Sequence, residues 1–264
     1  MKTGAKEKLY LACGKELAYV KKQEIKLHRD AYKQEQAIKK KISEKIPDAL
    51  EEKLELAFCK AFEIIFTKGT GLLEKTYSRK NIMDDYTIRD FTVNVKGTRG
   101  ELKKFRQSGS QKQNINMAIT TVEGLGLGVL GIGLPDIVGF MVVLLRGIYE
   151  ICLQYGFDYT KPEEKYLILK MMECSLSKKE EFTISDKAVD ELLLHPVCKE
   201  SIEIQARKTA KAMALDMLCL KFIQGFPIVG ILGGAGNPVY CNKIMKYVRL
   251  KYYKRYLLKK INHI

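Results

Sequence analysis

The sequence contains no tryptophan and only six prolines among its 264 residues. Because proline interrupts helices, its scarcity, together with abundant Lys, Glu, Leu and Ala, favours helical structure. Acidic residues are absent from one end of the chain: none follows Asp216, whereas nine basic residues do. This end is therefore expected to be a basic helical segment.

The sequence also lacks paired-cysteine motifs and closely spaced histidines. Its seven cysteines include no CxxC pair, and no secretory leader pattern opens the chain, so we expect buried free thiols in a cytoplasmic protein. His28, His195 and His263 lie far apart without zinc-binding spacing, so no metal site is expected. The GxGxxG motif at Gly126–Gly131 is not preceded by a strand, so we expect no nucleotide cofactor.

The formal net charge is +15, from 46 basic and 31 acidic residues. Such an excess attracts polyanions, either nucleic acid or an anionic membrane surface. The excess lies at the two ends, since the first 45 residues already hold thirteen basic and six acidic residues. The alternative interpretation is a lysine-rich surface that faces solvent. Only the net charge favours nucleic-acid binding, since the sequence contains no known nucleic-acid-binding motif.

The most apolar stretch is Glu123–Tyr155, and it is rich in glycine. Six glycines lie within residues 124–139, and Asp136 is the one charged residue among them. The 22 residues of Gly124–Leu145 are long enough to span a bilayer. An ionised Asp136 at the middle of a bilayer would, however, cost about 2.5–3.5 kcal/mol. We therefore interpret this stretch as a glycine-rich elbow between helices, and Gly225–Pro238 as a second elbow.

Apolar residues at helical spacing predict an all-α, multi-helix bundle that contains these two elbows. The expected helices are Lys6–Ile46, Asp48–Thr67, Leu72–Lys104, Asn114–Val122, Leu134–Tyr155, one that starts at Pro162, Phe182–Leu194, Val197–Gln224 and Val239–Ile261. Gly156 is expected to end one of them, and Gly97, Gly100 and residues 107–113 to form a loop. We interpret residues 1–110 as an N-terminal helical region and 111–264 as the helical core, with one continuous domain as the alternative.

The last helix carries a regular apolar stripe with basic residues beside it. The stripe consists of Cys241, Met245, Val248, Tyr252 and Tyr256. The steps of three and four residues keep these side chains on one face, and the lysines fall on other faces. The candidate contacts to a membrane or an anion are Lys243, Lys246, Arg249, Lys251, Lys254 and Arg255.

Four further residues are candidate ligand-binding residues at the helix ends. Asp136 either bonds free backbone amides at a helix start or lines a pocket, and Asn237 has the same two interpretations at the second elbow. Tyr155 and Asp158 flank a helix end, where capping and ligand binding both remain open.

Several short motifs follow one another in a characteristic order. Gly131-Ile-Gly-Leu-Pro135-Asp136 leads into an apolar helix ending at Tyr155-Gly-Phe-Asp158, and Pro162-Glu-Glu164 follows; later come Pro227-Ile-Val-Gly230, Gly233-Gly-Ala-Gly-Asn237 and a basic, tyrosine-rich helix at Arg249–Leu257. This order resembles the EcsC family of bacterial proteins over roughly residues 114–258. The resemblance implies a mostly helical protein that is cytosolic or membrane-associated. A named member is associated with an ABC transporter operon, which implies a membrane-protein partner.

These observations favour a non-enzymatic helical protein, cytoplasmic and peripheral to membranes, that acts at an anionic membrane surface or on a lipid-like ligand. The alternative is an enzyme with a pocket between the two elbows, which would use Asp136 as acid or base and Asn237 as a polar anchor. Apolar, glycine-rich backbone is rarely left exposed. We therefore expect residues 124–136 to contact residues 225–238.

Overall fold

A computed structural model gives the structure of the chain and describes residues 3–33, 46–67, 77–111, 134–177, 179–224 and 238–263. Every regular element in these ranges is an α-helix, which confirms the all-α class. The helices are α1 (Thr3–Lys33), α3 (Asp48–Thr67), α5 (Arg79–Lys96), α6 (Arg99–Gln111), α7 (Leu134–Gln154), α8 (Pro162–Leu176), α9 (Lys179–Leu192), α10 (Ile202–Gln224) and α11 (Pro238–Asn262). The glycine-rich part of the first elbow, the second elbow up to Asn237, and the expected contact between the elbows lie outside the described residues.

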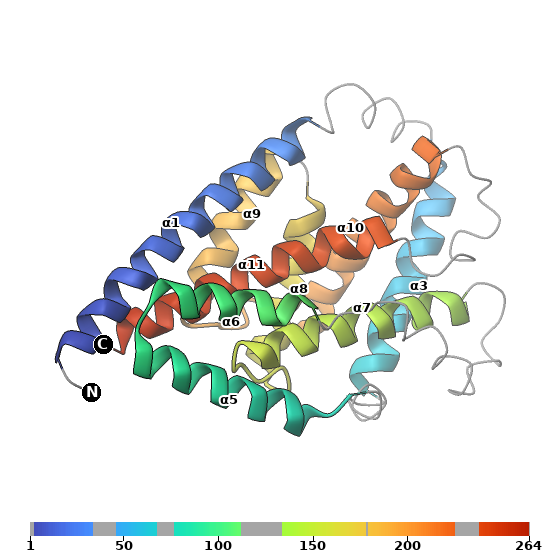
Figure 1. Cartoon of the computed structure of the whole chain (residues 1–264). Coiled ribbons are helices and arrows are strands. Elements are labelled where there is room, and N and C mark those ends of the chain that lie inside the picture. Colours follow the sequence, from blue (N-terminus) through green and yellow to red (C-terminus); the bar gives the residue numbers. More distant parts are fainter. Residues whose placement is uncertain are drawn as a thin grey trace.

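Helix α11 runs through the middle of the bundle, and the other helices lie around it (Figure 1). Helices α1, α7 and α8 pack directly against it. A second layer forms where α10 packs against α3 and α8, while α7 contacts both α3 and α5. The start of α1 and the end of α11 lie at the same end of the molecule (Figure 1).

The core contains side chains from both ends of the sequence, from Leu9 to Leu257. Helices on both sides of residue 110 therefore contribute to it. Its largest fully buried side chains include six tyrosines, and four of them lie on α11. Five of the seven cysteines are buried free thiols, as expected, whereas Cys198 is exposed and Cys59 is half-buried.

Helix α11 differs from the amphipathic helix that its apolar stripe predicted. The stripe is buried, but so are residues on its other faces, among them Tyr240, Tyr247 and Lys251. The long tyrosine side chains explain the difference, because each can bury its ring while its hydroxyl meets a polar group on a neighbouring helix. A helix can occupy the centre of a bundle when the side chains on all its faces are either apolar or paired with polar groups of neighbouring helices.

Several helix ends follow from local sequence. Gly156 has φ 78° just after α7, which confirms it as the residue that ends this helix. Pro162 begins α8 at the first helical position, where a missing N–H costs nothing. The single helix expected over Leu72–Lys104 is wrong, since Gly97 at φ 60° separates α5 from α6.

The loop expected over residues 107–113 is also wrong as far as the structure describes it, because α6 continues to Gln111. Leu102 and Phe105, three residues apart, are fully buried on one side of α6. Packing of this face holds the helix through the glycine and serine residues that disfavour helix.

Helix α7 holds one segment, Ile137–Gln154, that is long and apolar enough to cross a membrane by length and composition. In this fold 83% of that segment is buried against other helices. A buried core helix passes the same length and composition test, so the segment is weak evidence for a membrane span.

Two glycines are expected to respond to alanine in opposite directions. At Gly156 a Cβ would overlap the ring of Tyr86, and φ is 78°, so Gly156→Ala should lower the free energy of unfolding by roughly 1–3 kcal/mol. Gly14, within α1, has nothing within 4 Å of an added Cβ, so Gly14→Ala should raise it by about 0.5–1 kcal/mol. Urea unfolding measures the free energy of unfolding of both variants. Equal changes in the two variants would contradict the left-handed conformation assigned to Gly156.

Candidate functional site

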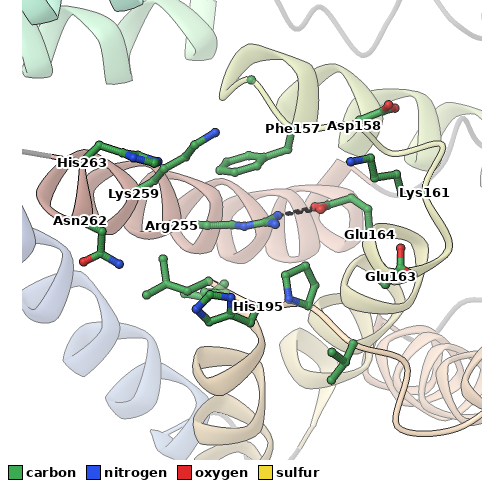
Figure 2. Close-up of a pocket in the computed structure, with 15 residues that line it drawn as sticks. Phe157, Asp158, Lys161, Glu163, Glu164, His195, Arg255, Lys259, Asn262 and His263 are labelled. Atoms are coloured by element: carbon green, nitrogen blue, oxygen red, sulfur yellow. Dashed lines mark hydrogen bonds and ion pairs between the residues drawn. The ribbon is translucent and has the colours of Figure 1, made fainter.

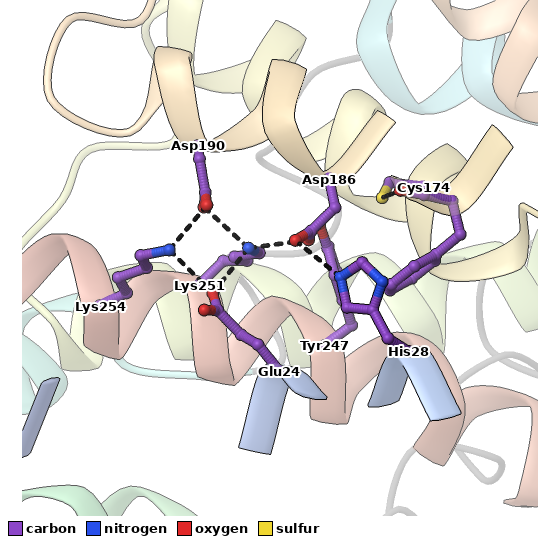
Figure 3. A network of polar contacts seen from close by, with 9 residues as sticks. Glu24, His28, Cys174, Asp186, Asp190, Tyr247, Lys251 and Lys254 are labelled. Atoms are coloured by element: carbon purple, nitrogen blue, oxygen red, sulfur yellow. Dashed lines mark hydrogen bonds and ion pairs between the residues drawn. The ribbon is translucent and has the colours of Figure 1, made fainter. Parts of the chain in front are cut away.

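A cluster of charged side chains surrounds Lys251 on α11, which is fully buried (Figure 3). The Lys251 Nζ lies 2.7 Å from Asp186, 2.7 Å from Asp190 and 2.8 Å from Glu24. Lys254 also pairs with Glu24 and Asp190, at 2.9 and 2.7 Å. We call these five residues the Lys251 cluster; it joins α1, α9 and α11.

Hydrogen bonds hold the acids of the Lys251 cluster in place. The Tyr247 hydroxyl donates to Asp186 at 2.6 Å, and the His28 ring lies 3.3 Å from the same carboxylate. Burial alone would raise the pKa of Asp186, but Lys251 and these hydrogen bonds lower it overall. Burial alone would lower the pKa of Lys251, but the surrounding carboxylates raise it. Both groups are therefore charged around neutral pH.

The three acids of this cluster are close enough together to bind a metal ion. The Lys251 ammonium, however, contacts all three at 2.7–2.8 Å and occupies the position that a cation would take. The cluster is therefore best described as a structural ion-pair network whose cation is part of the chain.

Three of the other basic residues of α11 are also paired with acids on different helices. The pairs are Lys243–Asp216 at 3.1 Å, Arg255–Glu164 at 2.7 Å and Lys260–Asp90 at 2.6 Å. This corrects the prediction that Lys251 contacts an external anion, because Lys251 is buried and paired inside the bundle, whereas Arg255 is buried and paired but lines a pocket. Lys243 and Lys254 are likewise paired with carboxylates. Sequence spacing could not show this, because the partners lie far away in the chain.

A large pocket opens beside the turn at Gly156, and we call it the Gly156 pocket (Figure 2). Its volume is about 750 Å³, within the range of small-molecule sites. Three segments far apart in the sequence form it: residues 156–164, residues 193–197 and the last turns of α11.

The floor of the Gly156 pocket is a buried arginine held by its neighbours. Arg255 Nη1 donates to both oxygens of Glu164 at 2.7 Å, and the guanidinium lies 3.9 Å from the centroid of the Phe157 ring. Glu164 also accepts a hydrogen bond from the Tyr252 hydroxyl at 2.7 Å. Within the described part of the chain, Arg255 uses Nη1 alone for hydrogen bonds, so Nε and Nη2 remain for a ligand.

The walls of the Gly156 pocket differ in character. Lys161 and Lys259 are exposed cations on opposite sides of Phe157 (Figure 2). The facing segment is mostly apolar, and it leaves Leu194 36% and Val197 52% exposed. Three acids, Asp158, Glu163 and Glu164, also line the pocket, together with the polar side chains of His195, Asn262 and His263.

A second, smaller hollow of about 200 Å³ lies where α1, α6, α11 and the end of α7 meet. Tyr155, Lys246 and Arg249, three of the predicted site residues, line it together with Arg106. We call it the Tyr155 pocket. It shares no lining residue with the Gly156 pocket.

The remaining predicted site residues have different outcomes. Asp158 lies at the Gly156 pocket but pairs with Arg79 at 3.0 Å and caps its own loop by accepting bonds from Thr160. The backbone of Asp136 lies in the first turn of α7, whereas its side chain and all of Asn237 lie outside what the structure describes. The pocket expected between the elbows therefore stays a prediction.

Sequence reasoning missed Phe157, Lys161, His195 and Lys259, which line the Gly156 pocket. Each is ordinary in its local sequence, and the pocket exists only because the fold brings their segments together. One signal was available: Phe157 follows the Gly156 turn directly, where a conformationally constrained glycine fixes the direction of the next side chain.

Lys251→Met should lower the free energy of unfolding by about 3–5 kcal/mol, because it leaves Glu24, Asp186 and Asp190 without their central cation. The matched control is Lys211→Met, an exposed lysine on α10, which should change it by less than about 0.5 kcal/mol. Urea unfolding measures both. A loss below about 1 kcal/mol for Lys251→Met would contradict the structural role of the cluster.

The effect of Lys251→Met should also depend on pH. Because the pKa of Asp186 is lowered in the folded state, its contribution is present above the unfolded value, ~3.9, and is lost as pH falls through the folded value. The stability difference between wild type and Lys251→Met should therefore be constant near neutral pH and shrink below about pH 4. Urea unfolding at several pH values measures it; a difference that persists unchanged in acid would rule out the carboxylates as its cause.

Comparison with known proteins adds one match. The model of the EcsC protein family matches residues 14–257, a longer region than the motifs alone indicated. No curated protein and no solved structure matches the chain. The family match includes all the described helices between α1 and α11 and most of these two. It contains every lining residue of the Tyr155 pocket, whereas Lys259, Asn262 and His263 of the Gly156 pocket lie beyond it. The chain therefore belongs to the EcsC protein family.

Proposed function

We propose that the protein binds an anionic amphiphile, a lipid-like molecule with a charged head and an apolar tail, in the Gly156 pocket. The observation that carries the proposal is that one hollow of about 750 Å³ is lined by three cations, one of them a fixed arginine, and by an exposed apolar segment. A wholly polar ligand would leave the apolar surface of Leu194 and Val197 uncovered, and a wholly apolar one would cover Lys161 and Lys259 without offering them an acceptor.

The charged head fits the Arg255 side of the pocket. Glu164 fixes the guanidinium through Nη1, so the remaining donors point in a set direction without loss of side-chain freedom on binding. Lys161 and Lys259 add charge at the two ends of this wall. An arginine that is already positioned binds carboxylate or phosphate groups more specifically than a free lysine does.

The apolar tail fits the segment from Leu193 to Val197. Two of its side chains are exposed without a ligand, and covering apolar surface is favourable in proportion to its area. An anionic membrane surface is the natural source of such a molecule, which agrees with the basic composition.

The proposal is for binding rather than catalysis. Cys152, whose Sγ lies 4.0 Å from Glu164 Oε1 at the pocket floor, is fully buried, and burial raises its pKa well above the ordinary value. Such a thiol stays protonated and is a poor nucleophile. The enzyme alternative depends on Asp136 and Asn237 and stays a prediction.

The test compares decyl phosphate with decyl maltoside, which has the same tail and a neutral head, by calorimetric titration below their micelle concentrations. Decyl phosphate should bind more tightly, and Lys161→Gln/Lys259→Gln should weaken its binding about tenfold or more, since hydrogen bonds to charged groups contribute about 1.5–3 kcal/mol. Lys211→Gln is the control for net charge and should leave the affinity unchanged.

Leu194→Ser should weaken the binding of decyl phosphate and leave the binding of methyl phosphate, which lacks the tail, unchanged. Equal binding of the two decyl compounds, or equal affinities for the double variant and the Lys211→Gln control, would overturn the proposal. Sedimentation with phosphatidylglycerol vesicles at low salt tests the membrane as the source, and absence of binding there would remove it.

A further inference from the structure

The hydroxyl of Tyr155 is buried and has no hydrogen-bond partner among the described residues. The residue as a whole is only 3% exposed, and its ring is fixed between Phe105, Tyr252 and Tyr253. A buried hydroxyl without a partner is unfavourable and uncommon in folded proteins. Because Tyr155 lines the Tyr155 pocket, a ligand there could supply the missing partner.

The charges that line this pocket are all positive. Arg106, Lys246 and Arg249 contribute to its wall, and no carboxylate does. Elsewhere along α11, four of the cations that point into the bundle meet an acid from another helix. Among the described residues, the lining of the Tyr155 pocket thus holds three cations and no carboxylate, although Glu16 lies behind Arg106.

Two neighbours hold the Arg106 guanidinium in place without forming a hydrogen bond to its Nε. Its guanidinium lies 3.9 Å from the centroid of the Tyr19 ring, and its Nε is 3.6 Å from Glu16 Oε2. That contact is an ion pair too long for a hydrogen bond, so Arg106 Nε is a second buried donor without a hydrogen-bond partner in the described part of the chain. Two residues that line one hollow, one on α6 and one just after α7, thus each hold a buried group without a hydrogen-bond partner among the described residues.

The remaining lining residues limit what can bind. The amides of Gln23 and Gln107 offer further donors, while Leu27 and Leu250 close the hollow with apolar surface. The volume of about 200 Å³ suits a compact group rather than an extended chain. Burial raises the pKa of Tyr155 to about 12, although the nearby arginines oppose the shift, so its hydroxyl is a neutral donor.

We propose that the Tyr155 pocket binds a phosphate group, either as free phosphate or as the head of a phosphomonoester. The Tyr155 hydroxyl donates one hydrogen bond to it, Arg106 donates through Nε, and Arg249 and Lys246 supply charge. Phosphate offers several acceptor oxygens in a compact tetrahedral group, which matches converging donors from three helices and the end of a fourth. This site is separate from the Gly156 pocket and does not depend on the function proposed for it.

The first experiment uses Tyr155→Phe, which removes the hydroxyl and keeps the ring. Thermal unfolding of the wild type should shift upward in inorganic phosphate relative to chloride at equal ionic strength, and Tyr155→Phe should lose most of this shift. Without phosphate, Tyr155→Phe should be as stable as the wild type or more stable, because an unpartnered hydroxyl has been removed.

Tyr149→Phe is the matched control. Its hydroxyl is also buried without a partner among the described residues, but it is stacked on Tyr159 and does not line the Tyr155 pocket. Tyr149→Phe should therefore keep the full phosphate shift. A wild type without a phosphate-specific shift, or a Tyr155→Phe variant that keeps it, would overturn the proposal.

Titration calorimetry with inorganic phosphate gives a second measurement. Arg249→Gln and Lys246→Gln should each weaken binding, about tenfold for Arg249, whereas Lys211→Gln should not. Should Arg249→Gln fail to fold, Lys246→Gln, at an exposed position, carries the test. The double variant Lys161→Gln/Lys259→Gln should bind phosphate normally, which separates this proposal from that for the Gly156 pocket.

Two further arms identify the source of the phosphate group. Glycerol 3-phosphate represents a soluble phosphomonoester, and phosphatidic acid vesicles represent a lipid head, with phosphatidylcholine vesicles as the control. Tyr155-dependent binding of either one supports the site and names its source. Binding of phosphate, glycerol 3-phosphate and vesicles that is equal in the wild type and in Tyr155→Phe would show that surface charge alone attracts them.

Discussion

The bundle depends on burying the cations of α11 together with carboxylates from other helices. Lys251 is fully buried, and its three acids come from α1 and α9. A buried ion pair of this kind adds little net stability over an apolar core, but removing one partner is costly. Its consequence is specificity, because only one arrangement of α1, α9 and α11 lets every charge of the cluster meet its partner.

Because these cations are buried with carboxylates, the basic composition of the C-terminal part does not produce a basic surface at Lys251, Lys254 and Arg255. The C-terminal part holds no acidic residue, yet Lys251, Lys254 and Arg255 are neutralised by acids supplied earlier in the chain. Each ion pair removes one positive and one negative charge, so the net charge of +15 is unchanged and comes from cations other than these three. Among the described residues, the lining of the Tyr155 pocket holds cations and no carboxylate, whereas cations and carboxylates both line the Gly156 pocket.

The turn after α7 connects the two pockets. Tyr155 and Phe157 are two residues apart, yet one lines each pocket, because Gly156 between them takes a left-handed conformation. Helix α11 lies beside both, with Arg249 at one and Arg255 at the other. One central helix and one turn thus position a set of cations at each pocket. The aromatic rings at the turn, Tyr155 and Phe157, are held by contacts with residues of α11.

The sequence by itself determined the features that depend on local chemistry. Helix α3 has the predicted bounds, Pro162 starts α8 and Gly156 ends α7, because caps, proline and glycine act within one helical turn. The family was also predicted from short ordered motifs.

Tertiary structure alone decided which cations are exposed and where the pockets lie. Lys251 and Glu24 are 227 residues apart, and spacing along a helix carries no information about partners at that distance. The continuation of α6 to Gln111 was decided in the same way, since burial of Leu102 and Phe105 outweighs the weak local preferences of glycine and serine.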